Sequence, residues 1–377
     1  MRLRSVWSVA LFSALVWVST AAAAFTPNRL VVSRVGDGAS ALSGNAFSVH
    51  LDEYTFGGVA TGYSVVLPTT ASGGNYALTL SGTATSVGQL SKSANGQYLA
   101  IFGVDAPVGT TSPNSNSGFR GRTVALVDIN GTVNSTTRFE AAGMTPRSVT
   151  SSNGVDLWTA GDTGSGTTGG VRYNTLGSTV NGTLISDANF TTNTRVVNIY
   201  NGNLFVSASA GTAFGSWRGV NQLGSGLPTT GGQAGTVIVG GGASNAGPID
   251  SAYDFFFADD NTLYVTDDDT TSPLTTGIQK WTFNGTSWSL AWTAPISTRS
   301  ITGYKAGNDV YLFAITGEST PRLISLVDSG GPLAPSFTVL ATSPTNTAFR
   351  GVEISVPEPA TAAILAVIAA FGLRRRT

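Results

Sequence analysis

The chain has 377 residues, of which 11% are charged, with a formal net charge of −1, no cysteine and a single histidine, His50. The absence of thiols excludes disulfides, a cysteine nucleophile and thiolate metal sites, and one histidine excludes metal centres built from several histidines. Only three lysines are present, far apart in sequence, so we expect no clustered phosphate-binding surface and no nucleic-acid partner.

The first 24 residues have the parts of a secretory signal peptide. Two arginines precede an apolar stretch over residues 6–18, and Ala22 and Ala24 supply the small residues that a signal peptidase requires before its cleavage point. The alternative is an uncleaved anchor helix. We expect cleavage after residue 24 and export of the chain.

Residues 25–356 form the body of the chain, which is long enough for one large domain or two smaller ones. Five of the 20 basic residues but only one of the 21 acidic residues lie outside it, so its net charge is about −5. Gly, Ser, Thr and Asn are abundant, these residues are poor helix formers, and no long amphipathic helix is visible. The composition favours an all-β body.

A repeat runs through this body. Each copy begins with a pair of Asn, Asp or Gly residues, which favours a hairpin turn, and continues with a hydrophobic and aromatic run. The five copies are NGQYLAIFG from Asn95, NGVDLWTAG from Asn153, NGNLFVSAS from Asn201, DNTLYVTDD from Asp260 and GNDVYLFAI from Gly307. A strand precedes each copy and a further strand pair follows it. Four strands per unit of about 50 residues predict a β-propeller blade.

The two ends of the body complete each other. The segment NTAFRGVEI, residues 346–354, matches the first strand of a blade, and strand-like runs beginning at Asn28, Ala46 and Thr61 supply the other three. We therefore predict six four-stranded blades, closed by pairing N- and C-terminal strands. Seven blades are the alternative, because the Gly-rich stretch 231–247 has room for further strands. A parallel β-helix would repeat at about 20 residues instead.

The last 21 residues, 357–377, have three parts. A Pro-Glu-Pro box stops the preceding strand, a 14-residue apolar segment, 360–373, forms a short helix, and an arginine cluster ends the chain. At about 1.5 Å per residue this helix spans about 21 Å, less than the roughly 30 Å of a bilayer core, so it suits transient membrane association. The box and the cluster comprise Pro357, Glu358, Pro359, Arg374, Arg375 and Arg376.

This tail resembles the PEP-CTERM sorting signal. The resemblance implies recognition by exosortase, a membrane protease, and by secretion machinery during export to the surface or extracellular matrix of a Gram-negative bacterium, with a transient stay at the inner membrane. The body also resembles a group of secreted bacterial propeller-like proteins in the phrases RVGDG, HLDEYT, NTRVVNIYNG, YDFFFADD and GIQKW. That second resemblance implies a fold and no activity.

A column of mostly charged residues lies about six residues before the hairpin signals. In propellers the first strand of each blade lines the central channel, so these side chains are candidates for a ring that holds an anion or an acidic sugar. The alternative is a structural role between blades. The candidate ring residues are Arg147, Arg195, Asp254, Arg299 and Arg350.

A cluster of aspartates flanks the fourth repeat and is a candidate calcium site, because Ca²⁺ takes several oxygen ligands. The spacing does not match the EF-hand pattern, so a solvated loop tip is the alternative. The residues are Asp259, Asp260, Asp267, Asp268 and Asp269. No other cofactor is expected.

His50 and Asp52 share one face of a predicted strand, with Glu53 on the other, an arrangement from which a general base can be built. No nucleophile motif accompanies them, so we assign no catalytic residue. Tryptophans are candidates for stacking on sugars, although most should pack between blades.

The sequence predicts a noncatalytic, exported propeller that binds or organises extracellular polysaccharide. An extracellular sugar-active hydrolase or lyase, using the channel mouth, is the second hypothesis. A purely structural matrix protein is the third.

Overall fold

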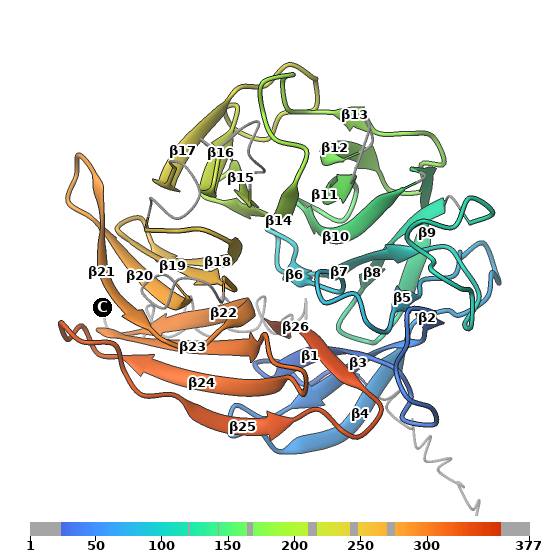
Figure 1. Cartoon of the computed structure of the whole chain (residues 1–377), viewed down its shortest axis with the longest axis horizontal. Helices are drawn as coiled ribbons and strands as arrows, with labels where there is room; N and C mark the ends of the chain where they lie inside the picture. Colours follow the sequence, from blue (N-terminus) through green and yellow to red (C-terminus); the bar gives the residue numbers. More distant parts are fainter. Residues whose placement is uncertain are drawn as a thin grey trace, which may run out of the picture.

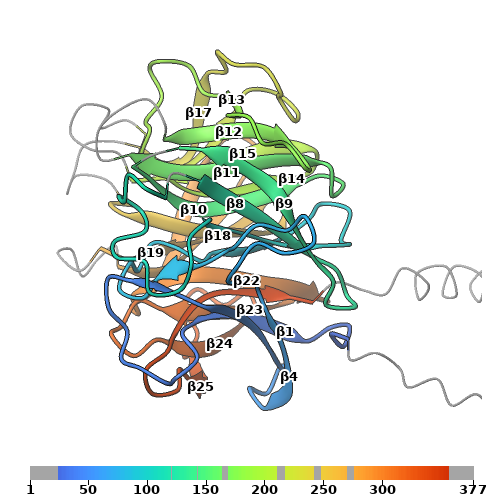
Figure 2. The same ribbon diagram turned by 90° about the vertical axis from the view of Figure 1, so that its right-hand side faces the viewer.

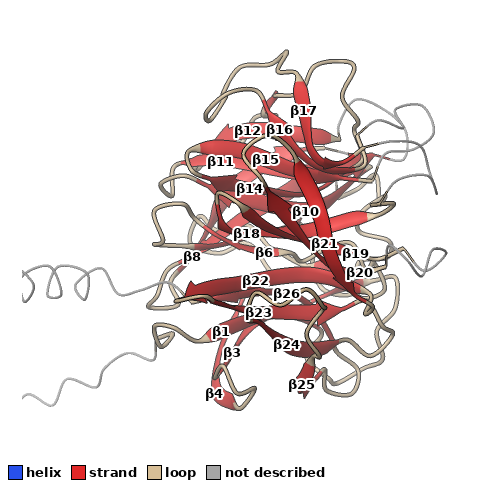
Figure 3. Ribbon diagram, turned by 90° about the vertical axis from the view of Figure 1, so that its left-hand side faces the viewer, coloured by secondary structure: helices blue, strands red, loops and turns tan. Residues whose placement is uncertain are grey.

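The computed structural model describes residues 24–119, 121–141, 143–163, 169–209, 217–241, 248–269 and 276–355. Within these ranges every regular element is a β-strand (Figure 3). Six four-stranded antiparallel sheets surround a central channel (Figure 1). The predicted all-β, six-bladed propeller is confirmed. The PEP-CTERM tail and residues 1–23 of the predicted signal peptide lie outside the described residues.

We number the blades in chain order, each from its inner strand outwards. Blade 1 is β6 (Leu90–Lys92), β7 (Leu99–Val104), β8 (Gly121–Val127) and β9 (Val133–Glu140). Blade 2 is β10 (Met144–Ser151), β11 (Asp156–Thr163), β12 (Gly170–Thr175) and β13 (Thr183–Leu184). Blade 3 is β14 (Thr194–Tyr200), β15 (Asn203–Ala208), β16 (Gly219–Leu223) and β17 (Gly235–Gly240).

The remaining blades follow the same order. Blade 4 is β18 (Ala252–Asp259), β19 (Thr262–Asp267), β20 (Gly277–Phe283) and β21 (Trp288–Ala294). Blade 5 is β22 (Thr298–Ala306), β23 (Asp309–Thr316), β24 (Arg322–Asp328) and β25 (Thr338–Thr342). Blade 6 is β26 (Ala348–Ile354), β1 (Leu30–Val35), β3 (Val49–Tyr54) and β4 (Ala60–Val66). A small separate pair is β2 (Ala46–Phe47) with β5 (Leu80–Ser81).

Blade 6 closes the ring as the sequence predicts. The N-terminal β1 lies between β3 and the C-terminal β26, with Leu30 opposite Ile354 and Val35 opposite Ala348. Pairing the two ends of the body leaves no open sheet edge at the seam. The alternative of seven blades is wrong, because the strand in the Gly-rich stretch is β17, the outer strand of blade 3.

The core lies between blades. In β7 every residue is buried: Leu99 and Ile101 pack towards blade 6, while Ala100 and Phe102 pack towards blade 2. Alternation along a strand sends successive side chains to opposite faces, so a strand covered on both faces is apolar throughout. Six buried clusters occur in the described residues, one at each of the six blade interfaces.

Inner strands of neighbouring blades are joined by repeated side-chain bonds. The Ser148 Oγ in β10 accepts from the Val197 backbone in β14 at 2.9 Å, and the Ser300 Oγ in β22 accepts from the Val352 backbone in β26 at 3.1 Å. Because these bonds join equivalent positions, the inner strands run in the same direction around the channel. Residues at their starts gather at one end of the channel, which we call the arginine end. Residues at the C-terminal ends of these strands gather at the opposite end of the channel, which we call the channel mouth. Figures 2 and 3 show the ring from its two sides.

Candidate functional site

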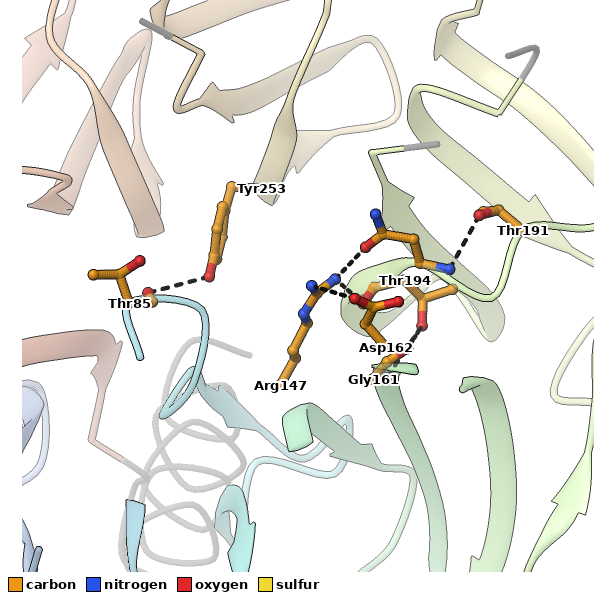
Figure 4. A network of polar contacts seen from close by, with 8 residues as sticks. Thr85, Arg147, Gly161, Asp162, Thr191, Thr194 and Tyr253 are labelled. Atoms are coloured by element: carbon orange, nitrogen blue, oxygen red, sulfur yellow. Dashed lines mark hydrogen bonds and ion pairs between the residues drawn. The ribbon is translucent and has the colours of Figure 1, made fainter. Parts of the chain in front are cut away.

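Four of the predicted ring residues, Arg147, Arg195, Arg299 and Arg350, lie at the arginine end. Arg147 is an ion-pair partner of Asp162, with Nη2 3.2 Å from Oδ2, and also donates to the Thr194 carbonyl (Figure 4). Arg299 Nε is 2.8 Å from Asp268 Oδ2. Arg350 donates to the Gly82 carbonyl at 2.8 Å. The Arg147–Asp162 pair lies within blade 2, whereas the other contacts reach a neighbouring blade or a loop between blades, so at least part of the column's role is structural.

Tyr253 lies among these arginines. The Arg195 guanidinium is 4.7 Å from the centroid of the Tyr253 ring, within the range of a cation–π contact. The Tyr253 hydroxyl donates to the Thr85 carbonyl at 3.3 Å, a contact between blade 4 and the loop that leads into blade 1 (Figure 4). The tyrosine is buried.

Asp254, the fifth predicted ring residue, is placed differently. Its Oδ2 accepts from the Ser300 hydroxyl at 3.1 Å and from the Ile301 backbone at 2.9 Å, both in blade 5. In blade 2, Ser148 accepts the equivalent bond from the Val197 backbone of the next blade. Asp254 therefore occupies the serine position of the repeat, and Tyr253 occupies the arginine position. Burial raises the pKa of the Asp254 carboxyl to about 7.

The aspartate cluster is divided between the two ends of β19. Asp259 pairs with Lys305 at one end, whereas Asp267 and Asp268 lie at the other. Asp268 pairs with Arg299, and Asp267 accepts from the backbone of Asp250, Ser251 and Asp269. Within the described ranges no group of three acidic or histidine side chains gathers in a way that could hold a metal ion. Calcium binding stays a prediction.

His50 and Asp52 lie on β3 in blade 6. The His50 ring is 3.1 Å from the Ser48 hydroxyl, and burial, followed by the charge of Arg34, lowers the pKa of His50. Asp52 accepts from Arg34 and from Ser64. A cavity of about 310 Å³ beside this strand is lined by Asp37, Asp52 and Glu53 but not by His50. Glu53 accepts from the Thr26 hydroxyl at 3.2 Å.

The channel mouth holds a cavity of about 220 Å³. Inner strands of five blades line it, among them β6 with Lys92, β22 with Thr302 and β26 with Glu353. The Thr302 hydroxyl donates to Glu353 Oε1 at 2.7 Å, and Lys92 Nζ lies 3.8 Å from the same oxygen. The rest of the wall comes from β14 and β18, including the aromatic rings of Tyr200 and Phe257.

A second cavity, also about 220 Å³, continues outwards from the mouth between blades 3 and 4. We call it the aromatic groove. It shares Tyr200 and Phe257 with the channel mouth, so both cavities border this pair of rings. The rings are stacked, with centroids 4.4 Å apart and 12° between their planes. The groove is lined by Tyr200, Asn201, Asn203, Phe205, Gln222, Ile238, Phe257, Asp260 and Trp288.

Local sequence explains why these side chains converge. Asn201 and Gly202 form the two-residue turn between β14 and β15, with φ values of 46° and 69°. Such turns require positive φ at both positions, which Asn and Gly tolerate. The turn places Tyr200 and Asn203 at the rim. The Tyr200 hydroxyl and the Asn201 amide both donate to Asp260 of blade 4, at 2.8 and 2.6 Å, and so tie the two blades together.

The groove combines flat apolar rings with neutral hydrogen-bonding groups. Trp288 and Phe257 offer ring surface, and Asn203 and Gln222 offer amides, which bond to each other at 3.3 Å. The charged groups of the two cavities are Lys92, Glu353 and Asp260. A surface of this kind matches a ligand that has both apolar faces and hydroxyl groups.

Sequence analysis did not identify this groove. Of the tryptophans, Trp158, Trp281 and Trp292 are buried and Trp217 packs at a blade interface, while Trp288 lines the groove. The signal available in sequence was the position of Tyr200 directly before a hairpin pair, at the end of an inner strand. Periodicity alone does not indicate that Phe257 of the next repeat lies against it.

The described residues contain no helix long and apolar enough to span a membrane. The sorting-signal residues, from Pro357 to Arg376, and the cleavage-site residue Ala22 lie outside the described ranges, so both signals stay predictions.

No family model and no curated protein sequence matches the chain. Among solved structures, the periplasmic gluconolactonase of Pseudomonas aeruginosa is 12% identical with a TM-score of 0.47, covering 88% of this chain and 100% of that one. Two candidate 6-phosphogluconolactonases are also 12% identical, each with a TM-score of 0.45. The alignment with the Bacteroides fragilis protein covers 83% of this chain and 82% of that protein. The alignment with the Bacteroides uniformis protein covers 84% of this chain and 83% of that protein. At this level of similarity their activities are not transferred to this chain.

Proposed function

We propose that this protein is an exported β-propeller that binds extracellular polysaccharide, without catalysis, in the channel mouth and the aromatic groove. The observation that carries the proposal is that Tyr200 and Phe257 line both cavities. The PEP-CTERM-like tail and the signal peptide are proposed to deliver the protein to the cell surface or matrix, where polysaccharide is available.

The shape of the site favours an extended ligand. Each cavity, at about 220 Å³, is smaller than the roughly 300–1,000 Å³ of a typical small-molecule site, whereas the two together fall within that range. The groove runs from the inner strands to β17 and β21 at the periphery, where Ile238 and Trp288 lie. A chain of several sugar units is therefore a better fit than a single sugar.

We propose that the protein has no catalytic activity because its titratable groups do not converge on one point of the two cavities. A hydrolytic site requires an acid and a base that converge on the ligand. Asp260 is engaged by Tyr200 and Asn201, and Glu353 by Thr302. His50 lies in blade 6, outside both cavities.

A sugar-active enzyme is the second candidate. One observation favours it: Glu353 lines the channel mouth beside Lys92, and the buried carboxyl of Asp254 lies close enough to Glu353 to interact electrostatically. If this hypothesis holds, incubation with a bound polysaccharide releases shorter or unsaturated products, and Glu353→Gln abolishes their release while preserving binding.

The test is a polysaccharide and glycan array probed with the full-length chain, once with calcium and once with chelator. We expect specific binding to extended glycans in both conditions, because neither cavity requires a metal. Binding that disappears with chelator would move the site to the aspartate cluster. No binding in either condition would contradict the proposal and favour a structural matrix protein.

A further inference from the structure

The first residue after the predicted cleavage point is fixed in the core. Phe25 is 1% exposed and packs in the cluster between blades 6 and 1. Its ring lies edge-on to that of Tyr63, with centroids 5.0 Å apart, and its backbone nitrogen donates to the Ile129 carbonyl, just after β8, at 2.8 Å. The ends of a domain are usually poorly ordered unless specific contacts hold them. The fold therefore holds the very end that removal of the signal peptide would create.

The next residue contacts a buried carboxylate. Glu53, on β3, is 2% exposed and accepts from both the backbone nitrogen and the hydroxyl of Thr26. Among the described residues no lysine, arginine or histidine forms an ion pair with Glu53. A buried carboxylate without a cation opposes folding, because it loses its hydration and no opposite charge replaces the water.

A second carboxylate lies close to the same point. Asp128 directly precedes Ile129, whose carbonyl accepts from the Phe25 nitrogen. Burial, followed by the charges of Glu53 and Asp128, raises the pKa of Tyr63, the ring that packs on Phe25. Asp128 also forms no ion pair within the described ranges. The surroundings of Phe25 therefore carry negative charge that no side chain in these ranges neutralises.

We propose that the α-ammonium group created on Phe25 by signal-peptide removal binds between the Glu53 carboxylate and the Ile129 carbonyl. Hydrolysis of the peptide bond after residue 24 leaves a carboxylate on the leader and an ammonium group on Phe25. That group has a pKa of about 8, so it is mostly charged at neutral pH, and its three N–H groups can donate to both acceptors at once. The uncleaved chain has a neutral nitrogen there with a single N–H, which Ile129 already occupies.

The reach of the site is fixed by covalent geometry. Three bonds separate the Phe25 nitrogen from the Thr26 nitrogen, so the two lie less than about 4 Å apart. The Thr26 nitrogen is itself hydrogen-bonded to Glu53, which puts the Phe25 nitrogen within about 7 Å of that carboxylate. Rotation of the Glu53 side chain closes the remaining gap.

Binding of the new terminus would strengthen the closure of the ring. Ile129 belongs to blade 1 and Glu53 to blade 6, and the Ser355 hydroxyl, just beyond β26, donates to the Thr26 carbonyl at 2.7 Å. The inference rests on the export part of the proposed function, and it does not involve either cavity of the polysaccharide site. Either proposal can therefore fail without the other.

The test compares thermal unfolding of two chains that end alike at residue 377, one beginning at Phe25 and one retaining residues 21–24. We expect a Tm about 2–4 °C higher for the chain that begins at Phe25, because only its ammonium group reaches Glu53. With Glu53→Gln the two chains should have the same Tm. Glu318→Gln is the control: Glu318 pairs with Arg322 at the surface, and this variant should keep the difference. Equal Tm values for the two wild-type chains would overturn the proposal.

Two measurements do not depend on any variant. In a crystal structure of the chain that begins at Phe25, the terminal nitrogen should lie about 2.7–2.9 Å from a Glu53 oxygen, and a separation beyond about 4 Å would contradict the site. Sequencing of the exported protein should give Phe25 as the first residue. Another first residue would refute this inference and leave polysaccharide binding unaffected.

Discussion

Asp254 shows how one residue determines a blade contact. Its carboxyl group is buried between blades 4 and 5, and it accepts hydrogen bonds from the Phe255 and Ile301 backbones and the Ser300 hydroxyl. Those bonds favour the ionised form, yet burial dominates and raises the pKa to about 7 from a usual 3.8. The serines that blades 2 and 5 carry here, Ser148 and Ser300, have no charge to bury.

Asp254 therefore predicts a pH dependence of stability. Because the folded pKa is above the unfolded one, the contribution of Asp254 is fully present below about pH 4 and is lost as the pH rises through about 7. Between these pH values, wild type should lose about 2–4 kcal/mol more unfolding free energy than Asp254→Asn, which cannot ionise. Urea unfolding at a series of pH values measures this difference. Asp37→Asn, at an exposed carboxyl, should follow wild type, and parallel curves for Asp254→Asn and wild type would refute the prediction.

At the residue scale, the sequence predicted the column of arginines but not which residue of blade 4 takes the equivalent position. The register shift between Ala252 and Phe255 has equivalents in β10, β14 and β22, but β18 has a second shift, between Phe257 and Asp259, so Tyr253 rather than Asp254 takes the arginine position. One extra residue in a strand moves every following side chain to the opposite face, and composition gives no sign of it.

At the element scale, β1 and β26 determine whether the ring exists. Leu30 of β1 is fully buried in the cluster between blades 5 and 6, where it packs with side chains of β23 and β26. The strand pairing was predictable, because both ends of the body carried incomplete sets of strand-like runs.

Leu30→Ala should lower the free energy of unfolding by about 2–5 kcal/mol, since it leaves a cavity at the seam. Val59→Ala is the control: Val59 is 66% exposed, and its loss should change stability by about 0.5 kcal/mol or less. Chemical denaturation of the two variants measures both values. A cost for Leu30→Ala as small as that of the control would mean that the seam does not stabilise the fold.

Inner and second strands were easier to predict than outer ones. Inner strands are flanked by hairpin pairs such as Asn201–Gly202, and they carry the apolar runs that the blade interfaces require. The outer strands are short or partly exposed, as β13 and β17 are. Neither a hairpin pair nor an apolar run therefore indicates them in the sequence. Their positions depend on pairing with strands already in place.

At the scale of the whole molecule, the groove is a product of assembly. Tyr200 and Asn203 come from blade 3, and Phe257 and Trp288 come from blade 4, so no single repeat contains the site. Sequence periodicity gives the number of blades, but not which side chains of neighbouring blades meet. The predicted export signals, in contrast, are local in sequence, lie outside the described residues and stay predictions.

The most direct test of this account is the affinity of the full-length chain for an array-selected polysaccharide, measured by titration calorimetry for wild type and Trp288→Ala. Because Trp288 offers ring surface in the groove, we predict about tenfold weaker binding by the variant, equivalent to about 1.4 kcal/mol. Phe337→Ala removes an exposed ring on blade 5, outside both cavities, and should bind as wild type does. Equal affinity for wild type and Trp288→Ala, with both proteins folded, would contradict the claim that the aromatic groove is the polysaccharide site.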